Sequence, residues 1–183
     1  MDSELLDRLR ARAAEVGFDA ASDPSLGDLL AALTASKPGG RFLELGTGVG
    51  VGTACLLRGM DEAGRLTTIE KEAELSLIAQ DEIQDDRVEW VIGDGAAWLS
   101  KTTDSFDLVF ADTWPGKFTH LEEALALVRP GGLYVVDDLV PQAHWHEDHR
   151  DAVERLVATL GSKPGWITAR IQDASGLLLC TRT

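Results

Sequence analysis

A strand-like apolar run leads into a glycine-rich turn in the segment Arg41-Phe42-Leu43-Glu44-Leu45-Gly46-Thr47-Gly48-Val49-Gly50-Val51-Gly52. Glycine adopts positive φ angles and lets a ligand approach the backbone closely. The helix expected over residues 51–60 would present unpaired N–H groups and a partial positive charge to such a ligand. The segment therefore predicts a strand, a ligand-binding turn and a helix.

Strands and helices alternate outward from this turn. Helices are expected over 4–16, 24–36, 51–60, 72–84, 96–99, 118–128 and 151–160. Strands are expected over 41–45, 65–69, 88–92, 106–111, 133–136, 166–171 and 176–181, with Pro130-Gly131-Gly132 as a turn. The last two strands have no helix between them, which predicts a hairpin and an antiparallel last strand. The pattern predicts an α/β fold with a doubly wound, Rossmann-like, seven-stranded and mostly parallel sheet.

The composition indicates one globular domain with an acidic surface. The chain has 183 residues, and we expect N-terminal helices in 1–37 and the core fold in 41–183. The formal net charge of −14 repels phosphate groups, so neither nucleic acid nor an anionic membrane is an expected partner. No apolar run approaches the roughly 18 residues of a membrane-spanning helix. Cys55 and Cys180 lie in apolar stretches without metal-binding spacing, and a cytoplasmic protein is the simplest expectation.

An acidic residue follows the second predicted strand. Glu70 ends that strand, and a carboxylate there can accept both hydroxyl groups of a ribose. A dinucleotide fingerprint would be G-x-G-x-x-G, but the sixth position from Gly46, Gly48 or Gly50 is never glycine. A G-x-x-x-x-G-K-[S/T] loop is missing as well, so a pyrophosphate ligand is disfavoured.

The pattern E-x-G-x-G-x-G closely resembles motif I of class I S-adenosylmethionine-dependent methyltransferases. The resemblance implies that Glu70 binds the cofactor ribose and that Asp94, between Gly93 and Gly95, binds the adenine. It assigns these residues to the cofactor site: Glu44, Gly46, Thr47, Gly48, Gly50, Glu70, Gly93, Asp94, Gly95 and Asp112. The alternative is a structural glycine-rich turn in which Glu70 and Asp94 cap helices.

Three carboxylates follow the fourth and fifth predicted strands. Asp112 follows Phe110-Ala111, and Asp137-Asp138 follow Val135-Val136, which places all three at the carboxyl edge of a doubly wound sheet. Clustered carboxylate oxygens suit Mg²⁺, Mn²⁺ or Ca²⁺. The motifs resemble the catechol and caffeoyl-coenzyme A O-methyltransferase group, which implies a divalent cation on Asp112, Asp137 and Asp138. The alternative is a metal-free methyltransferase in which these residues cap strand ends.

The chain departs from that group around the predicted catalytic base. The catechol-type enzymes carry a lysine three residues after the first metal aspartate, where this chain has Pro115, and Lys117 lies five residues on. The candidate catalytic residues are therefore Asp112, Lys117 and His144, and His144 could equally belong to a polar loop. The segments that shape the acceptor pocket in the group are shorter here. The acceptor site is therefore either open or completed by a second subunit in a homodimer.

The sequence predicts an S-adenosylmethionine-dependent O-methyltransferase that acts on a small, catechol-like hydroxylated acceptor with help from a divalent cation. Three alternatives stay open: a metal-independent methyltransferase, an aminopropyltransferase on the same fold, and a non-catalytic cofactor-binding module. The sequence does not identify the acceptor.

Overall fold

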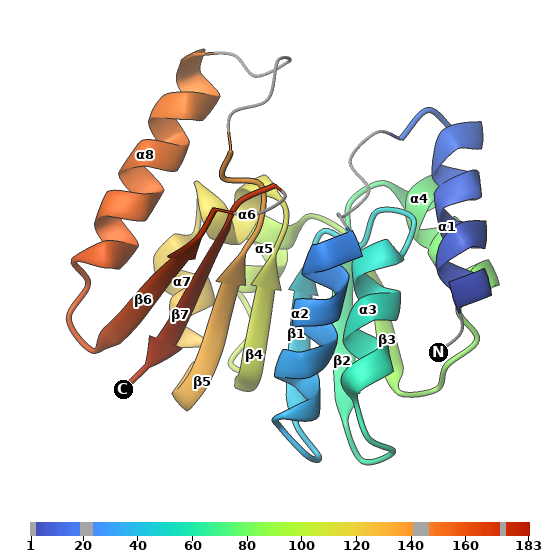
Figure 1. The fold of residues 1–183 in the computed structure, drawn as a ribbon, viewed down its shortest axis with the longest axis horizontal. Coiled ribbons are helices and arrows are strands. Elements are labelled where there is room, and N and C mark those ends of the chain that lie inside the picture. Colours follow the sequence, from blue (N-terminus) through green and yellow to red (C-terminus); the bar gives the residue numbers. More distant parts are fainter. Residues whose placement is uncertain (1–2, 19–23, 141–146, 173–174) are drawn as a thin grey trace.

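The sheet has seven strands with helices on both faces (Figure 1). The computed structural model describes residues 3–18, 24–140, 147–172 and 175–183. The strands are β1 (Arg41–Leu45), β2 (Arg65–Glu70), β3 (Val88–Ile92), β4 (Phe106–Ala111), β5 (Val128–Val136), β6 (Trp166–Ile171) and β7 (Leu177–Arg182). Their order is β3-β2-β1-β4-β5-β7-β6, so the direction of winding changes between β1 and β4.

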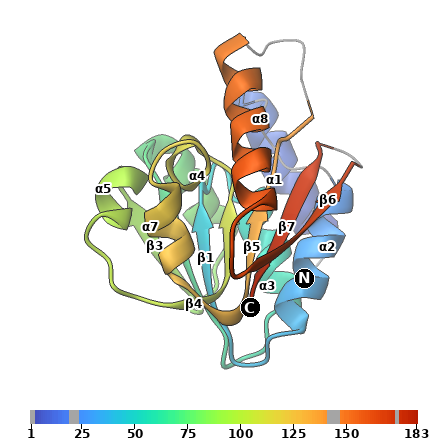
Figure 2. The ribbon, with the colours of Figure 1, turned by 90° about the vertical axis from the view of Figure 1, so that its left-hand side faces the viewer.

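The described helices divide between the two faces of the sheet (Figure 2). They are α1 (Ser3–Glu15), α2 (Pro24–Ala35), α3 (Val51–Gly59), α4 (Ala73–Glu82), α5 (Gly95–Leu99), α6 (Trp114–Lys117), α7 (Leu121–Ala126) and α8 (Glu147–Gly161). Side chains from α1 to α4 share one apolar core, and side chains from α5, α7 and α8 share the other. None of these described helices is long and apolar enough to cross a membrane.

Successive side chains of the central strands point to opposite faces of the sheet and pack into the two apolar cores in turn. In β1, Phe42 packs into the core under α1 to α4, while Leu43 and Leu45 pack into the core on the opposite face. β5 does the same, with Val135 on the first face and Tyr134 on the second. A strand buried on both faces is apolar at nearly every position, which is why these runs lack polar alternation.

The predicted strand directions are confirmed. β1 pairs with β2 and β4 in parallel, and β2–β3 and β4–β5 are parallel as well. β7 is antiparallel to β6, as the hairpin prediction requires, and it is also antiparallel to β5. The expected α/β fold with a Rossmann-like, doubly wound sheet is therefore correct.

The helix predicted over 118–128 is shorter in the structure, where α7 covers only Leu121–Ala126. His120, in a left-handed conformation with φ 54°, precedes α7, and the short helix α6, kinked at Pro115 and Gly116, lies before the predicted range. β5 begins at Val128 rather than 133, and the predicted turn lies inside it as an irregularity. Pairing shifts from Phe106–Val128 to Leu108–Leu133, so residues 129–132 bulge out of the ladder.

One glycine lets α2 and α3 pack closely. A Cβ atom on Gly59 would lie 1.9 Å from the Ala31 carbonyl oxygen and 2.3 Å from Thr34 Oγ. Thr34 is buried, and its hydroxyl donates to the Leu56 carbonyl of the facing helix at 3.0 Å. The two backbones therefore meet at a distance that only glycine permits.

Candidate functional site

Two adjoining hollows lie at the carboxyl edge of the sheet, where the strand order reverses. The first has a volume of about 240 Å³, and its walls include Phe18, Gly46, Thr47, Gly48, Val49, Val51, Gly52, Glu70, Glu72, Leu75, Asp112 and Thr113. The second, about 260 Å³, is lined by Leu45, Gly46, Ile69, Glu70, Lys71, Gly93, Asp94, Gly95, Thr113, Trp114 and Pro115. Because both include Gly46, Glu70 and Thr113, they form one trough. Ligands of doubly wound sheets bind at this place.

The glycine turn forms the floor of the trough. Gly46, Gly48 and Gly50 all have positive φ angles, of 100°, 52° and 96°. A Cβ on Gly46 would lie 2.9 Å from the Asp112 carbonyl oxygen, and one on Gly48 would lie 2.9 Å from the Phe18 ring. Side chains at these positions would therefore be strained, and at Gly46 and Gly48 they would also narrow the first hollow.

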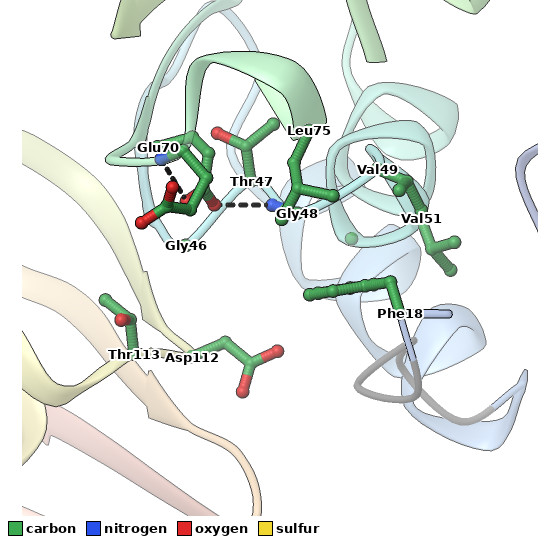
Figure 3. Close-up of a pocket in the computed structure, with 12 residues that line it drawn as sticks. Phe18, Gly46, Thr47, Gly48, Val49, Val51, Glu70, Leu75, Asp112 and Thr113 are labelled. Carbon is green, nitrogen blue, oxygen red and sulfur yellow. Dashed lines mark hydrogen bonds between the residues drawn. The ribbon is translucent and has the colours of Figure 1, made fainter. Parts of the chain in front are cut away.

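Glu70 holds the turn from the end of β2. Its Oε2 accepts the Gly48 N–H at 2.8 Å and its Oε1 accepts the Glu72 N–H at 3.0 Å (Figure 3). The carboxylate is therefore fixed where the two hollows meet. Each oxygen retains a lone pair for a ligand hydroxyl.

Most predicted cofactor residues line the trough, but Glu44 and Gly50 do not. Gly50 faces α4, where its Cβ would lie 2.9 Å from both Ala79 and Ile83. Glu44 is fully buried behind the turn. Gly50 therefore allows the turn to pack closely on α4, whereas Glu44 anchors the turn from inside the protein.

A buried hydrogen-bond chain connects Glu44 to the trough. Thr53 and Thr68 donate to Glu44 Oε2 at 2.5 and 2.6 Å, and the hydroxyls of Thr68 and Thr47 are 2.5 Å apart. Burial raises the pKa of Glu44 to about 8, although the two threonine hydroxyls that bind it oppose this shift. Glu44 is therefore largely protonated at neutral pH.

Glu44→Gln is expected to reduce the pH dependence of stability. Because the pKa is raised on folding from 4.5 to about 8, unfolding releases a proton between these values, and stability declines as pH rises through that window. Glutamine cannot ionise, so the variant should match the parent near pH 5 and exceed it by about 4 kcal/mol at pH 9. Urea unfolding at both pH values measures this. The exposed Glu74→Gln serves as control, and parallel decline of all three proteins would contradict the expectation.

Asp94 acts as a helix cap at the edge of the second hollow. Its Oδ1 accepts the Ala97 N–H at 2.8 Å, which caps α5. The sequence left capping and adenine binding as alternatives, but the side chain also lines the hollow. Capping by one oxygen leaves the other for a ligand, so the two roles are compatible.

An aromatic group borders the second hollow. Trp114 lines it, and the Trp114 and Phe118 rings pack edge to face with centroids 4.9 Å apart. The His149 ring of α8 packs against both, with its centroid 5.7 Å from that of Trp114 and 5.3 Å from that of Phe118. Neither His149 nor Phe18 was expected at the site, because contacts between distant elements leave no short motif in the sequence. His144 and its neighbour His146 lie outside the described residues.

The structure brings the three predicted carboxylates together with Lys117. Lys117 is buried, and its Nζ lies 3.8 Å from Asp112 Oδ1. Burial raises the pKa of Asp112 to about 7; the Lys117 ammonium opposes this shift, and the carboxylates of Asp137 and Asp138 add to it. Asp137 Oδ1 already accepts the Asp138 N–H at 2.7 Å and the Ser175 hydroxyl.

These surroundings do not fit the predicted divalent cation. Among the described parts of the chain, no group of three or more His, Cys, Asp or Glu side chains is arranged to hold a metal ion. Lys117 supplies a positive charge beside Asp112, and one oxygen of Asp137 is engaged by two donors. The cation prediction therefore gains no support from this geometry.

A mostly parallel seven-stranded sheet with a glycine-turn trough at its carboxyl edge defines a Rossmann-like methyltransferase fold. Comparison with known proteins gives the family. Residues 43–139 match the family described as "Methyltransferase domain", and the chain belongs to it.

Individual relatives agree with this assignment. A protein of Mycolicibacterium vanbaalenii named "Putative O-methyltransferase" is 38% identical over 175 residues, 92% of this chain and 69% of that protein. The matches span less than two thirds of the other curated relatives compared, 60 to 64% of their lengths.

Solved structures show the same architecture. The O-methyltransferase TomG of Streptomyces achromogenes, in complex with S-adenosylmethionine, is 26% identical with a TM-score of 0.87, covering 100% of this chain and 91% of that one. The Bacillus cereus O-methyltransferase, in complex with S-adenosylhomocysteine, has a TM-score of 0.88 at 23% identity, covering 100% and 92%. The predicted resemblance to O-methyltransferases and the predicted fold are confirmed.

Proposed function

We propose that this chain transfers the methyl group of S-adenosylmethionine to an oxygen of a small hydroxylated acceptor. Family membership and the names of its relatives support methyl transfer to oxygen over an aminopropyltransferase. The observation that carries the proposal is Glu70, whose carboxylate stands where the two hollows join. A ribose bound there would direct its base toward Asp94 and Trp114 and its methionine part toward Gly48 and Phe18.

Residues at the carboxyl edge support a place for the acceptor to react. When bound, S-adenosylmethionine supplies a sulfonium methyl group that the acceptor oxygen attacks. Asp112 lines the first hollow with Lys117 behind it, so a hydroxyl that enters there meets a carboxylate and a fixed positive charge. The carboxylate can accept the hydroxyl proton, and the positive charge stabilises the oxyanion that forms. His144 as a further base, the single-domain organisation, a homodimer and a cytoplasmic location stay predictions from the sequence.

Two measurements test the proposed function. Calorimetric titration with S-adenosylhomocysteine should show micromolar binding, about −8 kcal/mol. Incubation with S-adenosylmethionine and a panel of phenols and catechols should give methylated products by mass spectrometry. Binding without any product across the panel would favour a non-catalytic cofactor-binding module. The absence of binding would overturn the cofactor assignment itself.

Phe18→Ala is expected to weaken cofactor binding about tenfold, because a buried aromatic contact is worth roughly 1 kcal/mol beyond its area. Phe18 lies against Gly48 in the first hollow, opposite Glu70 (Figure 3). Phe18→Leu should retain most of the affinity, since it keeps an apolar wall. Val16→Ala, at an exposed position two residues away, is the matched control. Calorimetry with S-adenosylhomocysteine measures all four proteins, and equal affinity for Phe18→Ala would remove Phe18 from the site.

A further inference from the structure

A buried lysine occupies the carboxylate cluster at the ends of β4 and β5. The Lys117 side chain is only 5% exposed, and its Nζ lies 3.8 Å from Asp112 Oδ1. The carboxylates of Asp137 and Asp138 follow β5, beside Asp112 at the end of β4. A lysine is rarely buried unless its charge is paired, so this ammonium is held by the acidic groups around it.

The local fold directs Lys117 inward. Gly116 has φ 93°, and its carbonyl accepts the hydroxyl of Tyr134 at 2.5 Å. Tyr134 is fully buried in β5, and the Gly116 N–H donates to the Thr119 carbonyl at 2.7 Å. The kink before Lys117 is therefore fixed from both sides. Only glycine tolerates the φ angle of Gly116 without strain, so the backbone at this residue determines the inward position of Lys117.

One oxygen of the carboxylate cluster is already engaged by donors other than a metal ion. Asp137 Oδ1 accepts the Ser175 hydroxyl and the Asp138 N–H, which are ordinary hydrogen-bond donors. A divalent cation placed among the same carboxylates would stand within a few ångströms of the Lys117 ammonium. Two positive charges so close repel each other strongly in a site with little water.

We propose that the Lys117 ammonium is the resident cation of the cluster formed by Asp112, Asp137 and Asp138, and that the chain holds no divalent cation there. Combined with the proposed function, this makes methyl transfer independent of divalent cations. It also broadens the acceptor class. A chelated metal ion requires two adjacent oxygens on the acceptor, whereas a fixed ammonium requires one, so acceptors with a single hydroxyl group qualify.

Manganese binding tests the proposal without relying on activity. Calorimetric titration of the parent protein with Mn²⁺ should show no stoichiometric binding up to about 1 mM, equivalent to about −4 kcal/mol. Lys117→Met keeps the volume but removes the charge, and should gain a Mn²⁺ site at least about tenfold stronger. Asp112→Asn added to Lys117→Met should abolish that site. Lys163→Met removes a lysine that pairs with Glu122 on the surface and is the matched control.

Two results would overturn the proposal. One is stoichiometric Mn²⁺ binding by the parent protein that Asp112→Asn removes. The other is a folded Lys117→Met variant, verified by circular dichroism, that gains no Mn²⁺ site. If Lys117→Met does not fold, the parent protein and Asp112→Asn decide the question. If EDTA leaves methyl transfer unchanged and phenol is methylated as well as catechol, the acceptor class is supported. If neither acceptor is methylated, the proposed function is refuted, and the Mn²⁺ binding result still stands.

Discussion

Glu70→Ala is expected to weaken S-adenosylhomocysteine binding by about two to three orders of magnitude. The substitution removes the acceptor of the Gly48 N–H at 2.8 Å and of the Glu72 N–H at 3.0 Å, and it removes the proposed acceptor of the ribose hydroxyls. Hydrogen bonds to a charged group are worth about 1.5 to 3 kcal/mol each, so two lost bonds cost about 3 to 6 kcal/mol, and the expected loss of affinity corresponds to the lower half of this range. Calorimetry measures the dissociation constant.

Glu74→Ala is the control for this experiment, since Glu74 is an exposed acid in the first turn of α4 and lines neither hollow. It should bind S-adenosylhomocysteine like the parent protein. Thermal unfolding of both variants separates lost affinity from lost structure. If folded Glu70→Ala bound as tightly as the parent protein, the ligand would not lie across the junction of the hollows.

Gly59→Ala should be the most disruptive of the substitutions considered. Its methyl group would lie 1.9 Å from the Ala31 carbonyl oxygen, which forces α2 and α3 apart and strains the buried Thr34 bond to Leu56. Overpacking of this kind costs typically 1 to 3 kcal/mol, and we expect about 3 kcal/mol because a backbone atom must move. Urea unfolding measures the loss.

Gly161→Ala provides the matched comparison, because an added Cβ at this exposed end of α8 meets nothing within 4 Å. Alanine favours the helix, so stability should stay equal or rise by about 0.5 kcal/mol. If both variants lost a similar amount of stability, the distance between α2 and α3 would not depend on Gly59.

The strands were predicted from sequence more accurately than the helices that follow β4. The runs at 41–45, 88–92 and 106–111 coincide with β1, β3 and β4, because each is a short apolar segment bounded by polar or glycine residues. The prediction was least accurate at residues 118–132, where the helix is limited to α7 and the predicted turn lies inside β5. There, apolar spacing suggested one helix and Pro130-Gly131-Gly132 suggested a turn, whereas pairing with β4 absorbs those three residues as a bulge. Local pattern carries no information about such pairing.

The residues of the candidate site that belong to a sequence motif could be predicted. Gly46, Gly48, Glu70 and Asp94 follow strand ends in a recognisable order, and all four line the trough. Lys117 was named as a candidate, but its burial depends on a bond from Tyr134, a residue 17 positions away on another element. Phe18 reaches the site through the packing of α1. Contacts of this kind follow from tertiary structure alone.

The sheet is not completed in the order in which the chain is synthesised. β7 is inserted between β5 and β6, so β6 leaves the ribosome before the strand that joins it to the sheet. Until residues 177–182 emerge, β5 presents an open edge and β6 has no neighbour to pair with. A nascent chain at that stage would expose unpaired strands to other chains. We expect its solubility during translation to depend on how soon this last segment arrives.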